Sequence, residues 1–194
     1  MATIKEYYNK YGNEISFQQL QDIKEYIEII KNNNLIKEEK IFKGNNLEFV
    51  SYYKENTEQL ADILSKYPNN ITVNIKTHFE TYGIYKMVYE SNYFNQILSY
   101  KGRYLMNTDG NIILFQDLDI NTDNPIPGTT TKCFYYGKEE YYTFEYDETG
   151  QLINMNSNYH KNAGCWNPDD LNDLDGFSWA QVGNYYQNAD PVVP

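Results

Sequence analysis

The sequence has few of the residues that build catalytic and metal centres. Its 194 residues include 2 cysteines and 2 histidines. These are Cys133, Cys165, His78 and His160, and their spacing matches no zinc motif. No glycine-rich phosphate loop, Gly-x-Ser-x-Gly elbow or His-Glu-x-x-His helix is present. We therefore expect a protein that is not an enzyme and has no cofactor or metal, with a small hydrolase using His160 or Cys165 as the weakest alternative.

Long hydrophobic runs are also missing. The longest uninterrupted runs have about four residues, such as residues 112–115. A helix that crosses a membrane needs about 20 apolar residues. Residues 1–8 are mixed and charged, without the apolar core of a signal peptide. Two cysteines in a chain without an export signal are typical of reduced thiols. We expect a cytoplasmic protein with no membrane partner.

Positive charge is scarce, above all in the second half of the chain. The sequence has 16 Lys and Arg against 27 Asp and Glu, a formal net charge of −11. After residue 110, only Lys132, Lys138 and Lys161 accompany 13 acidic residues. A field of one sign repels phosphate backbones and anionic lipids, so we expect no nucleic-acid partner. It favours a cationic partner, a metal ion or simply solubility, and its clustering favours a partner.

The N-terminal residues follow a helical pattern. Apolar residues recur at helical spacing over 4–11, and Ser16 with Gln19 forms a capping-box pattern before an apolar stripe over 17–30. A second helix is expected between Thr57 and Pro68, after a possible hairpin around residues 44–46.

From about residue 70 the pattern changes to the period of two that is typical of strands. Asp109-Gly110 predicts a hairpin turn, residues 129–156 read as a three-strand meander, and a short helix is expected near the C-terminus. The predicted fold class is α+β, with N-terminal helices followed by a mainly antiparallel sheet and a short C-terminal helix. We expect a single domain over 1–194, made of a mainly helical part (1–68), an antiparallel sheet (70–156) and a loop with a short helix (157–194).

Two acidic clusters suggest cation binding. Asp117, Asp119 and Asp123 have the alternate spacing of a calcium loop, but Thr122 replaces the usual glycine and Gly128 the bidentate carboxylate. Turn formation by Asp and Asn is the simpler explanation. The second cluster, over residues 169–175, follows a proline, where acids at a helix start oppose the macrodipole. Calcium binding stays open as an alternative function.

Tyrosines are concentrated in the meander, and tyrosine is enriched at binding surfaces because it offers large contact area at low entropic cost. Cross-strand pairing for stability alone is the alternative. The predicted partner-binding set combines these tyrosines with the acids of this half: Asp117, Asp119, Asp123, Glu139, Glu140, Tyr141, Tyr142, Glu145, Asp169, Asp170, Asp173 and Asp175.

In charge, size and helix-then-sheet layout, the sequence resembles the small acidic cytosolic immunity proteins of bacterial toxin systems. The resemblance rests on these general properties and on no sequence motif. It implies an inhibitor that occludes the active surface of a basic toxin domain, such as a cationic nuclease, with fast capture through electrostatic steering. A calcium-binding or structural interaction module is the alternative.

Overall fold

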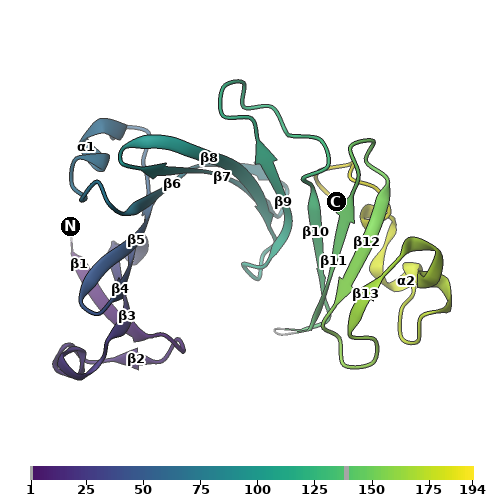
Figure 1. Cartoon of the computed structure of the whole chain (residues 1–194), viewed down its shortest axis with the longest axis horizontal. Helices are drawn as coiled ribbons and strands as arrows, with labels where there is room; N and C mark the ends of the chain where they lie inside the picture. The colour runs from purple at the N-terminus through teal and green to yellow at the C-terminus, as the bar shows by residue number, and fades with distance from the viewer. Residues whose placement is uncertain (1, 138–139) are drawn as a thin grey trace. The chain divides into compact units, whose positions relative to one another are not determined.

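Strands dominate this chain, and its helices are short (Figure 1). The computed structural model describes residues 2–137 and 140–194, with the backbone alone at residues 78 and 79. Strands hold 49% of the residues and helices 13%. The strands are β1 (Thr3–Asn9), β2 (Glu14–Ile15), β3 (Glu25–Asn32), β4 (Leu35–Lys43), β5 (Asn46–Tyr53), β6 (Thr72–Tyr82), β7 (Tyr85–Phe94), β8 (Ile97–Met106), β9 (Ile112–Leu118), β10 (Thr131–Tyr135), β11 (Tyr141–Tyr146), β12 (Leu152–Ser157) and β13 (Gly164–Trp166). The helical segments are α1 (Leu60–Leu64), α2 (Trp179–Val182) and the 3-10 helices η1 (Phe17–Asp22), η2 (Pro168–Asp173) and η3 (Asn184–Tyr186).

The N-terminal part is a sheet, so the predicted α+β class with N-terminal helices is wrong. The Ser16–Gln19 capping box is present, and the Ser16 backbone N–H donates to the Gln19 side-chain oxygen at 2.7 Å. However, it starts only the short η1, after which the chain is extended as β3. The Ile and Tyr residues of β3 favour strands, and β3 pairs on both sides, with β1 and β4. Cross-strand contacts outweigh the helical spacing of the same residues.

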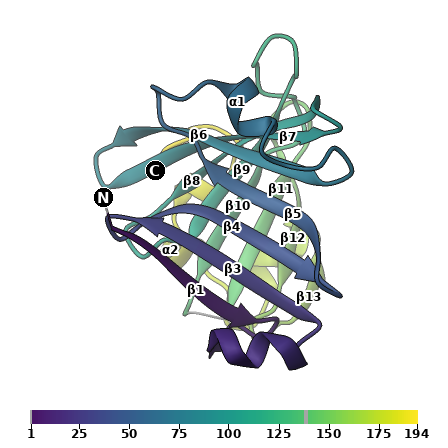
Figure 2. The ribbon, with the colours of Figure 1, turned by 90° about the vertical axis from the view of Figure 1, so that its left-hand side faces the viewer.

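One mixed sheet contains the strands of the described residues, in the order β13-β12-β11-β10-β9-β8-β7-β6-β5-β4-β3-β1-β2. β3, β4 and β5 form an antiparallel meander, which Figure 2 shows beside β1. β5 and β6 run parallel, because the chain returns through α1 between them. No helix among the described residues is both long and apolar enough to cross a membrane.

Turn residues form hairpins where the sequence predicts them. Gly44 has φ 56° between β4 and β5, and Gly110 has φ 82° between β8 and β9. Glycine adopts this left-handed conformation without steric cost. The hairpins around these two residues and the strands of the 129–156 meander are confirmed. The short C-terminal helix is confirmed as α2.

The chain forms two compact units. The N-terminal unit contains residues 1–78 and 89–101, and the C-terminal unit contains residues 79–88 and 102–194. In that unit, α1 and the residues around it pack on one face of β5 and β6, in a core made of Val50, Tyr52, Ile63, Leu64, Tyr67, Ile71, Val73 and Ile75.

Candidate functional site: the acidic C-terminal unit

The C-terminal unit buries one face of its strands under its own last segment. Tyr142, Phe144 and Tyr146 alternate along β11 and are at most 1% exposed. The buried residues that cover them come from η2, α2 and η3 and are Leu171, Val182 and Tyr186. We call the covered side the inner face and the opposite side the outer face.

A buried lysine ties the C-terminal segment to the inner face. Lys132 is 0% exposed, and its Nζ donates to the carbonyl oxygens of Tyr185, Asn188 and Pro191 at 2.7, 2.8 and 2.8 Å. Lysine is almost never fully buried unless its charge is satisfied. This arrangement removes one of the few positive charges of this half from the surface.

The outer face carries an aromatic pair and a carboxylate. Tyr141 is 37% exposed, and its ring centre lies 5.6 Å from that of Tyr135 on β10. Glu145 is half-buried and accepts hydrogen bonds from the amides of Asn154 and Asn156 at 3.3 and 3.0 Å. These amides hold the carboxylate in one orientation on the sheet.

Tyr142 was expected beside Tyr141 in the binding surface, but it is a core residue. Its side chain is 0% exposed, and its hydroxyl accepts a hydrogen bond from Asn162 Nδ2 at 2.9 Å. Successive residues of a strand point to opposite faces, so Tyr141 and Tyr142 do not share a surface. We therefore leave Tyr142 out of the candidate site.

Asp117, Asp119 and Asp123 lie at the end of β9 and in the loop that follows it. The Asp119 carboxylate accepts hydrogen bonds from the backbone N–H groups of Asn121 and Thr122, at 3.0 and 2.8 Å, and from the Thr122 hydroxyl at 3.0 Å. Such bonds are how aspartate commonly forms a turn. Within 2–137 and 140–194, no group of three His, Cys, Asp or Glu side chains is placed to hold a metal ion.

Four exposed carboxylates lie in the segment of residues 169–175, which includes most of η2. They belong to Asp169, Asp170, Asp173 and Asp175, and none forms an ion pair with a described Lys, Arg or His. Asp170 accepts only a 3.4 Å hydrogen bond from the Asn167 amide. This segment therefore presents negative charge that the described part of the chain does not neutralise.

In the N-terminal unit, several carboxylates form ion pairs with lysines. Glu6 lies 2.7 Å from Lys31, and Glu58 lies 2.6 Å from Lys37. Further lysine–glutamate pairs join β1, β3 and β4. The excess negative charge of the chain is therefore concentrated in the C-terminal unit, as the sequence composition indicates.

The predicted acidic residues do not share one face. Glu145 lies on the outer face, whereas Asp169 to Asp175 belong to the segment whose Leu171 covers the inner face. Glu139 lies outside the described residues. Glu140 is half-buried, and its Oε1 lies 2.7 Å from His160 Nδ1.

The described side chains offer no pair of a thiol and a histidine. His160 contacts Glu140, whereas Cys165 Sγ donates to Asn154 Oδ1 at 3.0 Å. Burial raises the pKa of Cys133 to about 11, although a hydrogen bond with Tyr135 opposes the shift. The Cys133 thiol is therefore protonated at neutral pH and is a poor nucleophile.

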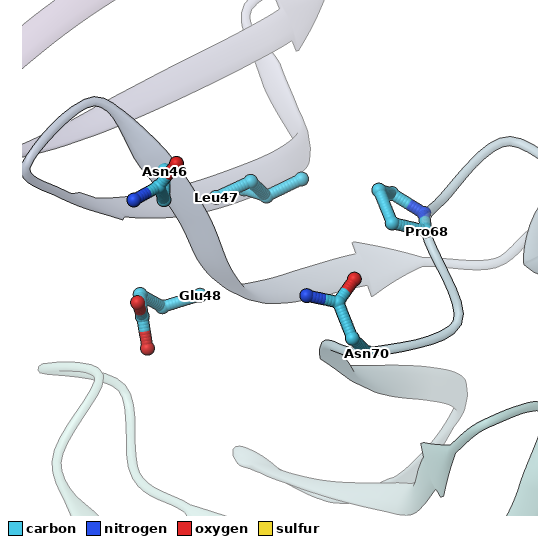
Figure 3. Close-up of a pocket in the computed structure, with 5 residues that line it drawn as sticks. All are labelled: Asn46, Leu47, Glu48, Pro68 and Asn70. Atoms are coloured by element: carbon cyan, nitrogen blue, oxygen red, sulfur yellow. The ribbon is translucent and has the colours of Figure 1, made fainter.

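A surface pocket in the N-terminal unit lies between the β4–β5 turn and the segment after α1 (Figure 3). Asn46, Leu47, Glu48, Pro68 and Asn70 line it. Of these five, only Glu48 is ionisable.

Sequence reasoning missed Lys132 and Asn162. Lys132 alternates with the inner-face residue Phe134, so the period of two already indicates an inward-pointing lysine. Asn162 is 4% exposed and joins Tyr142 to the backbone oxygen of Asp175. No sequence pattern marks this loop residue.

No family model, curated protein or solved structure matches this chain.

Proposed function

We propose that this chain is a protein-binding inhibitor that recognises a basic protein through the acidic surface of its C-terminal unit. The observation that carries the proposal is the set of exposed, unneutralised carboxylates at Asp169, Asp170, Asp173 and Asp175. Clustered charge of one sign accelerates encounter with a partner of opposite charge and disfavours like-charged partners. Tyr141 and Glu145 supply a second contact region on the outer face.

An immunity protein that occludes a cationic bacterial toxin domain is the specific role we propose. Charge and size support it, whereas the helix-then-sheet layout no longer does, because the N-terminal part forms strands such as β1 and β3 with only short helices beside them. The two cysteines are unpaired thiols, which supports action in the reducing cytoplasm. The role is one of binding and not of catalysis.

The proposal is tested with the full chain as bait in cell lysate at low and high salt. Captured proteins are identified, purified and tested again for direct binding. The test variant neutralises the acidic segment by D169N, D170N, D173N and D175N. The matched control neutralises four exposed acids of the N-terminal unit by E14Q, D22N, E48Q and D62N.

We expect a basic partner that binds the wild type and the control at low salt. With the purified partner, the test variant should associate about tenfold more slowly at low salt, because long-range attraction acts mainly on the association rate. Equal association rates for the two quadruple variants, or a partner that is itself acidic, would contradict the proposal.

A further inference from the structure

The side of the N-terminal sheet opposite α1 carries an apolar row and a polar row. Register places Ile27, Ile41 and Phe49 next to one another across β3, β4 and β5. The same pairing places Glu39, two residues before Ile41 in β4, opposite Ser51 of β5. In Figure 2, β3, β4 and β5 lie side by side in this order.

These two rows enclose a pocket of about 160 Å³. Apolar side chains form most of its wall, and the polar groups are one carboxylate and one hydroxyl: Ile27, Ile29, Ile41, Phe49, Glu39 and Ser51. An apolar cavity of about 150 Å³ is large enough for a benzene-sized molecule. The pocket can therefore take a stem of a few carbon atoms.

The polar groups of the pocket have no partner in the described part of the chain. Glu39 is half-buried and forms no ion pair or hydrogen bond with a described residue, and the same holds for the Ser51 hydroxyl. Glu6, on the same face, differs, because Lys31 donates to both of its carboxylate oxygens at 2.7 Å. Lys31 therefore neutralises the Glu6 carboxylate, whereas the Glu39 carboxylate has no cationic partner among the described residues.

An unsatisfied acceptor continues this polar row on the next strand. Asn74 of β6 pairs in register with Ser51 and is 4% exposed. Its Nδ2 donates to Asn92 at 2.7 Å and to Glu90 at 3.3 Å, but its Oδ1 is buried with no hydrogen-bond partner. A buried acceptor without a partner costs about 1–3 kcal/mol. Asn74 does not line the pocket, however, so the acceptors that a ligand meets there are Glu39 and Ser51.

We propose that this pocket binds the side chain of a lysine carried by a basic protein segment. Lysine joins a flexible four-carbon stem to a compact charge with three N–H donors. The stem fits the apolar walls, and the ammonium group meets the Glu39 carboxylate and the Ser51 hydroxyl.

The inference rests on the proposed function only for the source of the lysine, a basic protein. The pocket itself is tested with a capped five-residue peptide that has one lysine between glycines. The control peptide carries ε-acetyl-lysine, which keeps the stem and removes the charge. Binding to the full chain is followed by NMR, using the methyl groups of Ile27 and Ile41 and the Ser51 amide.

We expect saturable shifts of these three signals with the lysine peptide. The acetylated peptide should bind at least about tenfold more weakly, and so should the E39Q variant with the lysine peptide, because each loses a charged hydrogen bond. The E14Q variant, which removes an exposed carboxylate of β2, should bind like the wild type.

Three results would overturn the inference: equal binding of the two peptides, unchanged binding by E39Q, or shifts confined to residues 169–175. Failure here is distinguishable from failure of the proposed function. If the pocket is silent while the D169N/D170N/D173N/D175N variant still loses the captured partner, the proposed function stands without this site. If the pocket binds the lysine peptide while that quadruple variant behaves like its control, the lysine site stands and the proposed function fails.

Discussion

The ammonium group of Lys132 lies 3.8 Å from the centre of the Tyr185 ring and donates to the carbonyl oxygen of the same residue. Two further carbonyls, of Asn188 and Pro191, accept from it. One side chain of β10 thus fixes the path of the C-terminal segment that completes the inner-face core.

Replacing Lys132 by methionine should destabilise the C-terminal unit. The apolar stem is kept, but three carbonyl oxygens lose their donor, and each unpaired buried acceptor costs about 1–3 kcal/mol. We expect a loss of at least about 3 kcal/mol in the free energy of unfolding, measured in urea. The control is Lys161→Met, at an exposed lysine of the same unit, which should change stability by less than about 0.5 kcal/mol. Equal unfolding midpoints for the two variants would show that the lysine does not anchor the segment.

Tyr141 and Tyr142 should respond differently to the loss of their hydroxyls. The Tyr142 hydroxyl accepts from Asn162 inside the core, so Tyr142→Phe should cost about 1 kcal/mol of unfolding free energy. Tyr141→Phe removes a hydroxyl from an exposed ring and should be neutral within about 0.5 kcal/mol. Thermal or urea unfolding of the two variants in parallel decides the point, and a larger loss for Tyr141→Phe would contradict the assignment of faces.

Local sequence signals predicted the hairpins around Gly44 and Gly110 and the 129–156 meander, but they wrongly indicated helices where β1 and β3 lie. Gly44 and Gly110 adopt the left-handed backbone that a tight turn needs without steric cost, so the hairpins around them are visible in the sequence. The Ser16–Gln19 capping box was equally visible, and it does form. What followed it was not predictable from spacing, because β3 is determined by neighbours on both sides that the local pattern does not contain.

The candidate site was predictable in its charge and unpredictable in its arrangement. The acidic composition after residue 110 is a sequence property. The turn that Asp119 forms is local and was indicated by the sequence. That Glu145 and Asp173 belong to different sides of one sheet depends on the register and on the path of the C-terminal segment. The pocket at Glu39 and Ser51 was missed because it requires three strands in register.

The N-terminal unit should lose stability in acid through Glu58. Burial alone would raise the pKa of Glu58, but hydrogen bonds from Lys37, Tyr52 and the Glu55 backbone outweigh it and lower the pKa to about 2 from an ordinary value of 4.5. A carboxyl group with a lowered folded-state pKa stabilises the fold fully above its unfolded pKa. That stabilisation, up to about 3 kcal/mol, is lost as the pH falls from 4.5 towards 2.

The measurement is urea unfolding of the wild type and Glu58→Gln between pH 6 and 2. The variant should be less stable at pH 6, and its stability should change less with pH over this window, because the titrating group is gone. Glu14→Gln, at an exposed carboxylate, should keep the wild-type dependence. Parallel curves for Glu58→Gln and the wild type would exclude this network as a source of acid sensitivity.

The two cysteines should react at very different rates. Cys165 is exposed, whereas Cys133 is partly buried within the sheet and burial raises its pKa to about 11. The thiolate is the reactive form, and at pH 8 Cys133 is almost entirely protonated. Iodoacetamide at pH 8 should therefore modify Cys165 first, which peptide mass spectrometry measures directly. Cys165→Ser should leave a chain that is labelled at least about tenfold more slowly until it is unfolded in urea. Rapid labelling of that variant in the folded state would place Cys133 in contact with solvent and contradict the packing of β10 described above.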